Sequence, residues 1–347
     1  MSRPVIRSRR EDIKRFMNLV SYRIKKINEA EPKPVTGKYG VNVLADKLHP
    51  KTQKLVISDS RHLSEKTKIL SLTPADGSLS FFRAGQSINI KNGSFSSPLP
   101  LLSAPGDKKY EIAVFADAND NVSKSLSELP VGSVIEASGP EGLFYYSPLR
   151  DKKTVIAVCT SEGIAPIISM AKSEDFNLKI IYCDKTRKFD FRELLNEFTV
   201  EYTSEFTDEY IPSDCSVFIS GPADFCENVS SCLKLEAGRA RIHIALPAQT
   251  ECLPAAEYKC TVIYKDKKFE FSCFGNETVL AAFERNSIPS PAKCKVGECG
   301  FCRCRLIEGK VNTITTAGID SRRKADEKYD FIHPCRAFAE SDITLAL

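Results

Sequence analysis

The stretch that decides the fold is CKVGECGFC, residues Cys294 to Cys302, which places three cysteines in nine positions. A fourth, Cys335, follows Cys302 after thirty-two intervening residues. The resulting pattern, C-x4-C-x2-C with one distant cysteine, is the ligand spacing of plant-type [2Fe–2S] clusters. The spacing therefore predicts that Cys294, Cys299, Cys302 and Cys335 hold such a cluster.

Two glycines inside this stretch favour the same interpretation. Gly297 and Gly300 carry no Cβ, so backbone amides can turn inward and approach the sulfurs. A tetrahedral zinc site is the alternative, but structural zinc sites usually pair two short knuckles, whereas here one loop supplies three cysteines. Cys304 is expected to be a buried neighbour and no ligand. The core thiols are expected to be Cys252, Cys260 and Cys273.

Length and composition limit the other possibilities. The 347 residues suffice for two or three compact units, and 42% hydrophobic with 27% charged residues is typical of a soluble globular protein. The N-terminus lacks the apolar core of a secretory signal, and no run of eighteen apolar residues predicts a membrane span. Four of the thirteen cysteines fall between positions 294 and 304, which favours metal binding in a reducing, cytoplasmic compartment.

The first fifty residues differ from the rest in charge. They hold twelve Lys or Arg and five Asp or Glu, although the whole chain has a formal net charge of only +4. Apolar residues at helical spacing predict a helix over 11–30, and a second short helix is expected at 41–50. No nucleic-acid motif accompanies the charge, so we expect this extension to dock on a partner or on the protein itself.

The pattern of apolar and turn residues changes twice after residue 50. Short strand-like runs bounded by turn residues predict an antiparallel barrel over 51–149. Over 150–250, apolar strands alternate with helix-like stretches at 165–173, 191–198 and 223–235, which favours a parallel α/β unit. Over 256–347, a hairpin at 259–274, a helix with Asn276 as its N-cap, the cysteine loop and a last strand at 342–347 are expected.

This layout resembles the phthalate dioxygenase reductase-like branch of the ferredoxin–NADP reductase superfamily. FRAGQSINI (82–90) and VGSVIEASGPEGLFYY (131–146) are similar to its barrel motifs. EGIAPIISM (162–170) and FISGPADF (218–225) are similar to its nucleotide motifs. The resemblance implies an antiparallel flavin-type β-barrel, a parallel α/β nucleotide-type domain and a C-terminal β-grasp ferredoxin domain after the helical N-terminal extension. It implies electron transfer from NAD(P)H through FAD or FMN to the cluster and on to a partner protein.

The present chain departs from the family pattern most clearly at the flavin motif. The family's R-x-Y-[ST] aligns with SPLPLLSAP (97–105), so Ser97 replaces the phosphate-binding arginine and Leu99 the ring-lining tyrosine. Loss of the guanidinium removes a charge-assisted phosphate contact. The second phosphate segment is NDNVSKSL (119–126), with Asp120 near the glycine position. The flavin candidates carried over are Ser97, Leu99, Leu102, Ser103 and Ser123.

The nucleotide motif departs as well. The glycine-rich turn is CTSEGIAP (159–166), in which Thr160 and Glu162 add side chains where a pyrophosphate would approach. The acid and aromatic residue that many members carry at the end of the α/β unit are absent from IALPAQ (244–249). The nucleotide candidates are Gly163, Ser220, Gly221 and Pro222, and no residue is predicted to be catalytic in the sense of a nucleophile or base.

These observations leave two main functional hypotheses and a weaker one. The chain is either an NAD(P)H-dependent flavin and [2Fe–2S] oxidoreductase, or an electron-transfer subunit that works only in a multi-subunit complex after losing its flavin or nucleotide site. The weaker, third hypothesis is that the protein is a redox sensor. Basic residues flank the cluster motif and would either steer an acidic partner or form a solvated rim: Lys293, Lys295, Arg303 and Arg305. His333 lies near Cys335 and is expected at the surface, with a supporting position behind the cluster ligands as the alternative.

Overall fold

The computed structural model describes residues 9–29 and 52–347, with gaps at 93–94, 117–120, 174–175, 209–210, 213, 234–239, 245–252, 266, 289, 293, 296, 298 and 315–323. The chain divides into two compact units, Met1–Ala45 and Asp46–Leu347. In the first, helix α1 (Arg9–Glu29) confirms the predicted helix, and its apolar residues Ile13, Phe16 and Met17 are exposed. The helix expected at 41–50 lies outside the described residues.

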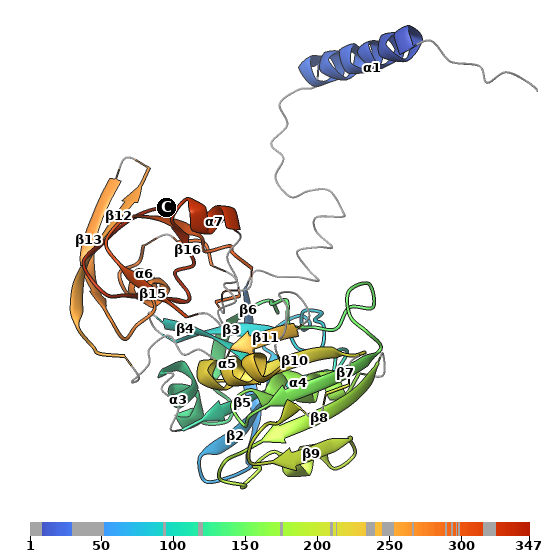
Figure 1. The fold of residues 1–347 in the computed structure, drawn as a ribbon, viewed down its shortest axis with the longest axis vertical. Coiled ribbons are helices and arrows are strands. Elements are labelled where there is room, and N and C mark those ends of the chain that lie inside the picture. Colours follow the sequence, from blue (N-terminus) through green and yellow to red (C-terminus); the bar gives the residue numbers. More distant parts are fainter. Residues whose placement is uncertain are drawn as a thin grey trace, which may run out of the picture. The chain divides into compact units, whose positions relative to one another are not determined.

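The second unit begins with an antiparallel sheet of six strands (Figure 1). Its strand order is β4-β3-β6-β1-β2-β5. The bounds are β1 (Thr52–His62), β2 (Thr67–Pro74), β3 (Ser87–Asn92), β4 (Phe95–Pro100), β5 (Tyr110–Phe115) and β6 (Val134–Ser138), with helix α3 (Asn121–Glu128) between β5 and β6. Leu, Ile and Val side chains from these strands point inward and form the buried core of the barrel, which confirms the predicted barrel.

A parallel sheet of five strands follows, in the order β11-β10-β7-β8-β9. Its strands are β7 (Thr154–Cys159), β8 (Asn177–Cys183), β9 (Val200–Thr203), β10 (Ser216–Gly221) and β11 (Ala240–Ile244), with helices α4 (Ile164–Ala171) and α5 (Ala223–Cys232). The helix expected at 191–198 is wrong in extent, because only a 3-10 turn forms at Arg192–Leu195.

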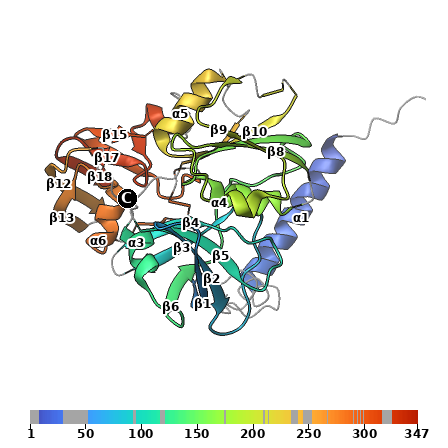
Figure 2. The same ribbon diagram turned by 90° about the horizontal axis from the view of Figure 1, so that it is seen from below.

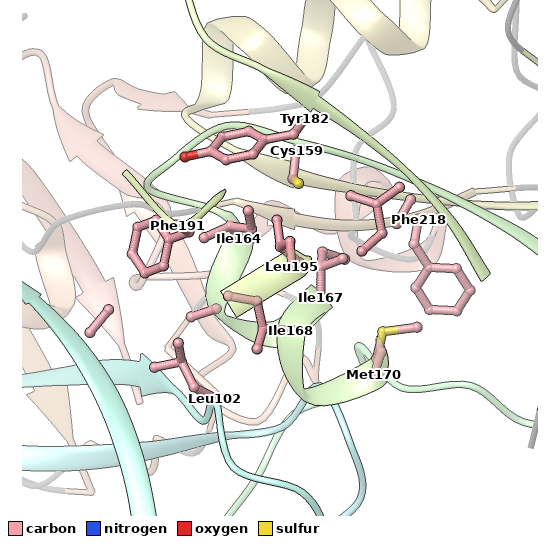
Figure 3. Packing of buried hydrophobic residues seen from close by; sticks show 14 of the residues in the cluster. Leu102, Cys159, Ile164, Ile167, Ile168, Met170, Tyr182, Phe191, Leu195 and Phe218 are labelled. Atoms are coloured by element: carbon pink, nitrogen blue, oxygen red, sulfur yellow. The ribbon is translucent and has the colours of Figure 1, made fainter. Parts of the chain in front are cut away.

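Helix α4 joins the parallel sheet to the barrel. Seven of its eight residues are buried, so it has no solvent face. Figure 2 shows α4 between the two sheets. Ile164, Ile167 and Ile168 share one core with Leu102 of the barrel and Phe218 of the parallel sheet (Figure 3). This shared core holds the two sheets in contact through apolar burial.

The C-terminal part contains a mixed sheet ordered β13-β12-β18-β14-β16 and a small β15-β17 pair. Its elements are β12 (Glu257–Tyr264), β13 (Lys267–Phe274), α6 (Val279–Arg285), β14 (Cys304–Glu308), β15 (Val311–Thr313), α7 (Lys324–Lys328), β16 (Phe331–Ile332), β17 (Ala337–Ala339) and β18 (Ile343–Ala346). The β12–β18 pair is parallel and the β12–β13 hairpin antiparallel. This arrangement agrees with the predicted β-grasp domain.

The N-cap of α6 corrects the sequence prediction. Thr278, not Asn276, caps the helix, because its hydroxyl accepts a hydrogen bond from the backbone amide of Ala281 at 3.1 Å. Helix α6 also contacts strand β4 of the barrel. Within the described residues, no helix is both long and apolar enough to cross a bilayer. The domain boundaries at 50, 149 and 250 stay a prediction.

Candidate iron–sulfur site and neighbouring cofactor regions

The four predicted ligands come from two separate segments of the C-terminal part. Cys294, Cys299 and Cys302 lie in the loop between α6 and β14, and Cys335 lies in the turn between β16 and β17. Cys299 is half-buried, whereas the other three thiols are buried. The fold therefore brings the distant cysteine to the loop, as the spacing requires.

The four thiols form two pairs. The sulfurs of Cys302 and Cys335 are 3.5 Å apart. In the other pair, the backbone amide of Cys299 donates to Cys294 Sγ at 3.4 Å. Among the described residues, no three His, Cys, Asp or Glu side chains gather around the position of one metal ion. Two thiols at each of two positions match the ligand demand of a two-iron cluster, in which each iron takes two cysteines.

Hydrogen bonds inside these pairs favour the thiolate form of one cysteine in each pair, Cys299 and Cys302. The hydrogen bond with Cys294 is the main reason why the pKa of Cys299 falls to about 5. The hydrogen bond with Cys335 lowers the pKa of Cys302, and the same contact together with burial raises the pKa of Cys335. Phe301 adds a backbone amide that donates to Cys299 Sγ at 3.4 Å. The loop amides thus turn toward sulfur, as predicted for a site that stabilises negative charge.

One side of the loop is closed by residues that follow β16. His333 Nδ1 lies 3.2 Å from the Gly297 carbonyl oxygen, and its side chain is buried. The prediction of a surface position for His333 is therefore wrong, because the loop folds over the imidazole. Arg336 is also buried, and a Cβ on Gly297 would lie 1.8 Å from Arg336 Cδ. With φ at +79°, Gly297 occupies a position that only glycine fills without strain.

The remaining thiols near the loop are structural. Cys304 is buried, and burial raises its pKa far above the usual range. Cys260 and Cys273 are also buried, and burial raises the pKa of Cys260 to about 12. Protonated thiols of this kind behave as small apolar side chains. Cys252 lies outside the described residues.

The flavin-motif positions of β4 face the barrel interior. Ser97 and Leu99 pair with Ile90 and Ile88 of β3, and both side chains are buried. Leu99 belongs to the apolar core of the barrel. Ser97 carries no cation for a flavin phosphate, and Leu99 carries neither an aromatic ring nor a hydroxyl for the isoalloxazine ring. These residues therefore do not fit the family's way of holding a flavin.

The other flavin candidates already serve the fold. Ser123 Oγ accepts a hydrogen bond from the Phe115 amide at 2.9 Å, which fixes α3 to β5. Ser103 Oγ accepts from the Glu111 amide, and the Ser103 carbonyl accepts from Ser169 Oγ at 2.7 Å. Leu102 is part of the core under α4 (Figure 3). Asp120 lies outside the described residues.

A cavity of about 500 Å³ opens at the carboxyl edge of β7, β8 and β10, where α/β sheets commonly bind ligands. Its volume suits a nucleotide. Its charged lining residues are Glu162, Asp184, Lys185, Glu205 and Asp224. Among the described lining residues the acids outnumber the single lysine, so this lining opposes a pyrophosphate.

The nucleotide-motif residues are closely packed at this carboxyl edge of the parallel sheet. A Cβ on Gly163 would lie 2.1 Å from the Ser220 carbonyl oxygen, so the turn before α4 needs glycine there. A Cβ on Gly221 would lie 2.8 Å from the Phe225 ring. Pro222 caps α5 and lines the cavity. Among the described residues, Ser220 Oγ and Thr160 Oγ1 are both buried here without a hydrogen-bond partner.

Known proteins resemble this chain along most of its length. Residues 262–340 match the family described as a 2Fe-2S iron-sulfur cluster binding domain. The phthalate 4,5-dioxygenase reductase subunit of Pseudomonas putida is 27% identical over 287 residues, covering 76% of this chain and 86% of that protein. The carnitine monooxygenase reductase subunit of Acinetobacter pittii is 25% identical over 277 residues, covering 74% and 90%.

A solved structure of phthalate dioxygenase reductase, described as a modular structure for electron transfer from pyridine nucleotides to [2Fe-2S], has the same fold. It superposes with a TM-score of 0.67 at 22% identity, covering 85% of this chain and 98% of that one. These similarities show that the chain shares the fold of phthalate dioxygenase reductase, with a 2Fe-2S cluster-binding domain at residues 262–340.

Proposed function

We propose that this protein is the electron-transfer component of an oxygenase-type system, in which single electrons leave through a [2Fe–2S] cluster held by Cys294, Cys299, Cys302 and Cys335. The convergence of these four thiols as two pairs carries the proposal. When bound, the cluster supplies a one-electron redox couple. The residues of the chain hold it as thiolates, direct amides toward the sulfurs and close one side with His333.

The family supports an NAD(P)H-dependent reductase as the first candidate. The relatives are named reductase subunits of a dioxygenase and of a carnitine monooxygenase. An oxygenase is therefore the expected acceptor, and a nicotinamide cofactor the expected donor. In this reading, the barrel and the α/β unit bind FAD or FMN and NAD(P)H with residues other than the family motif.

A relay subunit is the second candidate, and the buried Ser97 and Leu99 favour it. Such a chain keeps the barrel as a scaffold and receives electrons from another protein. Both candidates share the cluster and differ in whether flavin is present.

The experiment is a count of iron and flavin in anaerobically purified protein, before and after incubation with FMN and FAD. Two irons and one flavin per chain, with bleaching of the cluster by NAD(P)H, establish the reductase. Two irons without flavin, and bleaching by dithionite alone, establish the relay. Cys299→Ser and Cys335→Ser are expected to lose iron, whereas the matched control Cys304→Ser keeps it. Full iron retention in Cys335→Ser refutes the ligand assignment.

A further inference from the structure

The cluster loop has one closed side and one open side. On the closed side, His333 and Arg336 pack against Gly297. Arg336 also lies close enough to helix α5 to lower the pKa of Cys226, although burial raises that pKa overall, to about 12. A redox partner therefore cannot reach the cluster from this side without moving the protein interior.

The open side begins at Phe301, between the ligands Cys299 and Cys302. Its backbone amide donates to Cys299 Sγ, yet its side chain is 49% exposed. In the following strand β14, alternation puts Arg305 on the face opposite Cys304, and a register irregularity between Leu306 and Glu308 interrupts this alternation at Ile307. Arg303, Arg305 and Ile307 are exposed, whereas Cys304 is buried beneath them.

The neighbouring strand β16 extends this face. Arg305 is the register partner of Phe331, so their side chains lie on the same side of the sheet. The Arg303 guanidinium lies over the Phe331 ring, 4.8 Å from its centroid. We call the surface formed by Phe301, Arg303, Arg305, Ile307 and Phe331 the cluster-edge patch.

The charge of this patch comes mainly from Arg305. Arg303 forms an ion pair of 2.7 Å with Asp326, whose side chain is almost fully buried, so that pair is locally neutral. Arg305 has no ion pair among the described residues and keeps its full charge at the surface. The cluster-edge patch is thus an exposed aromatic and aliphatic surface with a cationic side chain at its centre, the composition enriched at protein–protein contacts.

We infer that the cluster-edge patch is the docking surface for a redox protein with acidic residues around its own cofactor. The inference rests on the proposed function, since it assigns the partner of the same cluster. The charge of Arg305 is complementary to carboxylates, and the exposed Phe301 and Ile307 supply apolar contact area. One electron passes from the reduced cluster to the oxidised cofactor of the partner, with no proton or covalent bond involved.

Two soluble haem proteins of opposite charge serve as probes: acidic cytochrome b5 and basic cytochrome c. Calorimetric titration of the oxidised, cluster-loaded full chain gives the affinity, and stopped-flow oxidation of the dithionite-reduced chain gives the electron-transfer rate to ferric haem. We expect cytochrome b5 to bind more tightly than cytochrome c, with an affinity that falls as salt rises.

Arg305→Glu is expected to weaken cytochrome b5 binding and slow its reduction about threefold to tenfold at low salt, and Phe301→Ser to weaken binding with little change in the salt slope. Lys267→Glu, the same charge change at the first residue of β13, is the matched control and should have no effect. Equal binding of the two cytochromes, or an unchanged affinity in Arg305→Glu, overturns the docking surface. A reduced chain that passes electrons to neither cytochrome nor to ferricyanide instead refutes the proposed function.

Discussion

The substitution Gly297→Ala tests the cluster loop most directly. Gly297 has φ at +79°, and an added Cβ would lie 1.8 Å from Cδ and 2.7 Å from Cγ of the buried Arg336. The left-handed backbone costs an L-residue about 1–2 kcal/mol. Overpacking against a side chain that is held in place costs a further 1–3 kcal/mol. The expected total is about 2–5 kcal/mol against the conformation that holds the cluster.

Two other glycines separate these contributions. Gly77 has φ at +70° with nothing within 4 Å, so Gly77→Ala reports backbone strain far from the cluster loop. Gly300 has φ at +64°, and its nearest neighbour, His333 Nε2, would be at an ordinary 3.4 Å. Gly300→Ala therefore reports strain inside the loop without overlap.

The assay is the loss of the visible absorption of the cluster when an iron chelator competes for the metal, with iron content as the second readout. Because each 1.4 kcal/mol is a factor of ten, the overlap term alone should make Gly297→Ala lose its cluster roughly 5- to 100-fold more readily than Gly300→Ala. Equal retention of iron in the two variants would refute the packing of Arg336 against the loop.

Three further predictions concern stability. Arg285 pairs at 2.5 Å with the fully buried Glu277, so Arg285→Ala should destabilise the C-terminal part by about 3–5 kcal/mol, seen as a lower melting temperature of the cluster absorption; an unchanged melting curve contradicts it. Ser123→Ala leaves the Phe115 amide unpaired and should cost about 1–3 kcal/mol in urea unfolding without altering flavin content; a loss of bound flavin would instead assign Ser123 to a cofactor. Burial lowers the pKa of His243 to about 4, so on acidification the unfolded chain takes up the proton before the folded chain does. The free energy of unfolding should therefore be at its full value above pH ~6.5 and fall by up to about 3 kcal/mol as the pH drops toward 4. His243→Gln should remove this pH dependence in urea unfolding, and an unchanged pH dependence argues against the assignment to His243.

Local patterns predicted the elements well where one physical cause dominates. The stripe of apolar residues gave helix α1, and the apolar runs of the α/β unit gave the parallel strands β7, β8 and β10. The prediction was wrong where neighbouring groups compete. Both Asn276 and Thr278 can cap a helix, and only the fold decides that the Thr278 hydroxyl reaches the Ala281 amide. At 191–198, the sequence indicates a helix, but only Arg192–Leu195 forms a turn.

The family motifs show the same division. The sequence identified the changes at Ser97 and Leu99, but not that both side chains are buried and face the barrel interior. It also carried Ser123 over as a flavin candidate, whereas its hydroxyl accepts a hydrogen bond from the Phe115 amide. A hydroxyl that binds a phosphate and one that binds a backbone amide look the same in a sequence, because the difference lies in the partner.

The sequence by itself determined the candidate ligands, because cluster coordination fixes the residue type and restricts the spacing along one loop. Only the tertiary structure decided which side of that loop is open. His333 and Arg336 are more than thirty residues from Gly297 along the chain, and long-range packing places them against it. The same packing leaves the loop residue Phe301 at the surface, and it also leaves Arg305 there, since alternate residues of β14 must face opposite sides of the sheet.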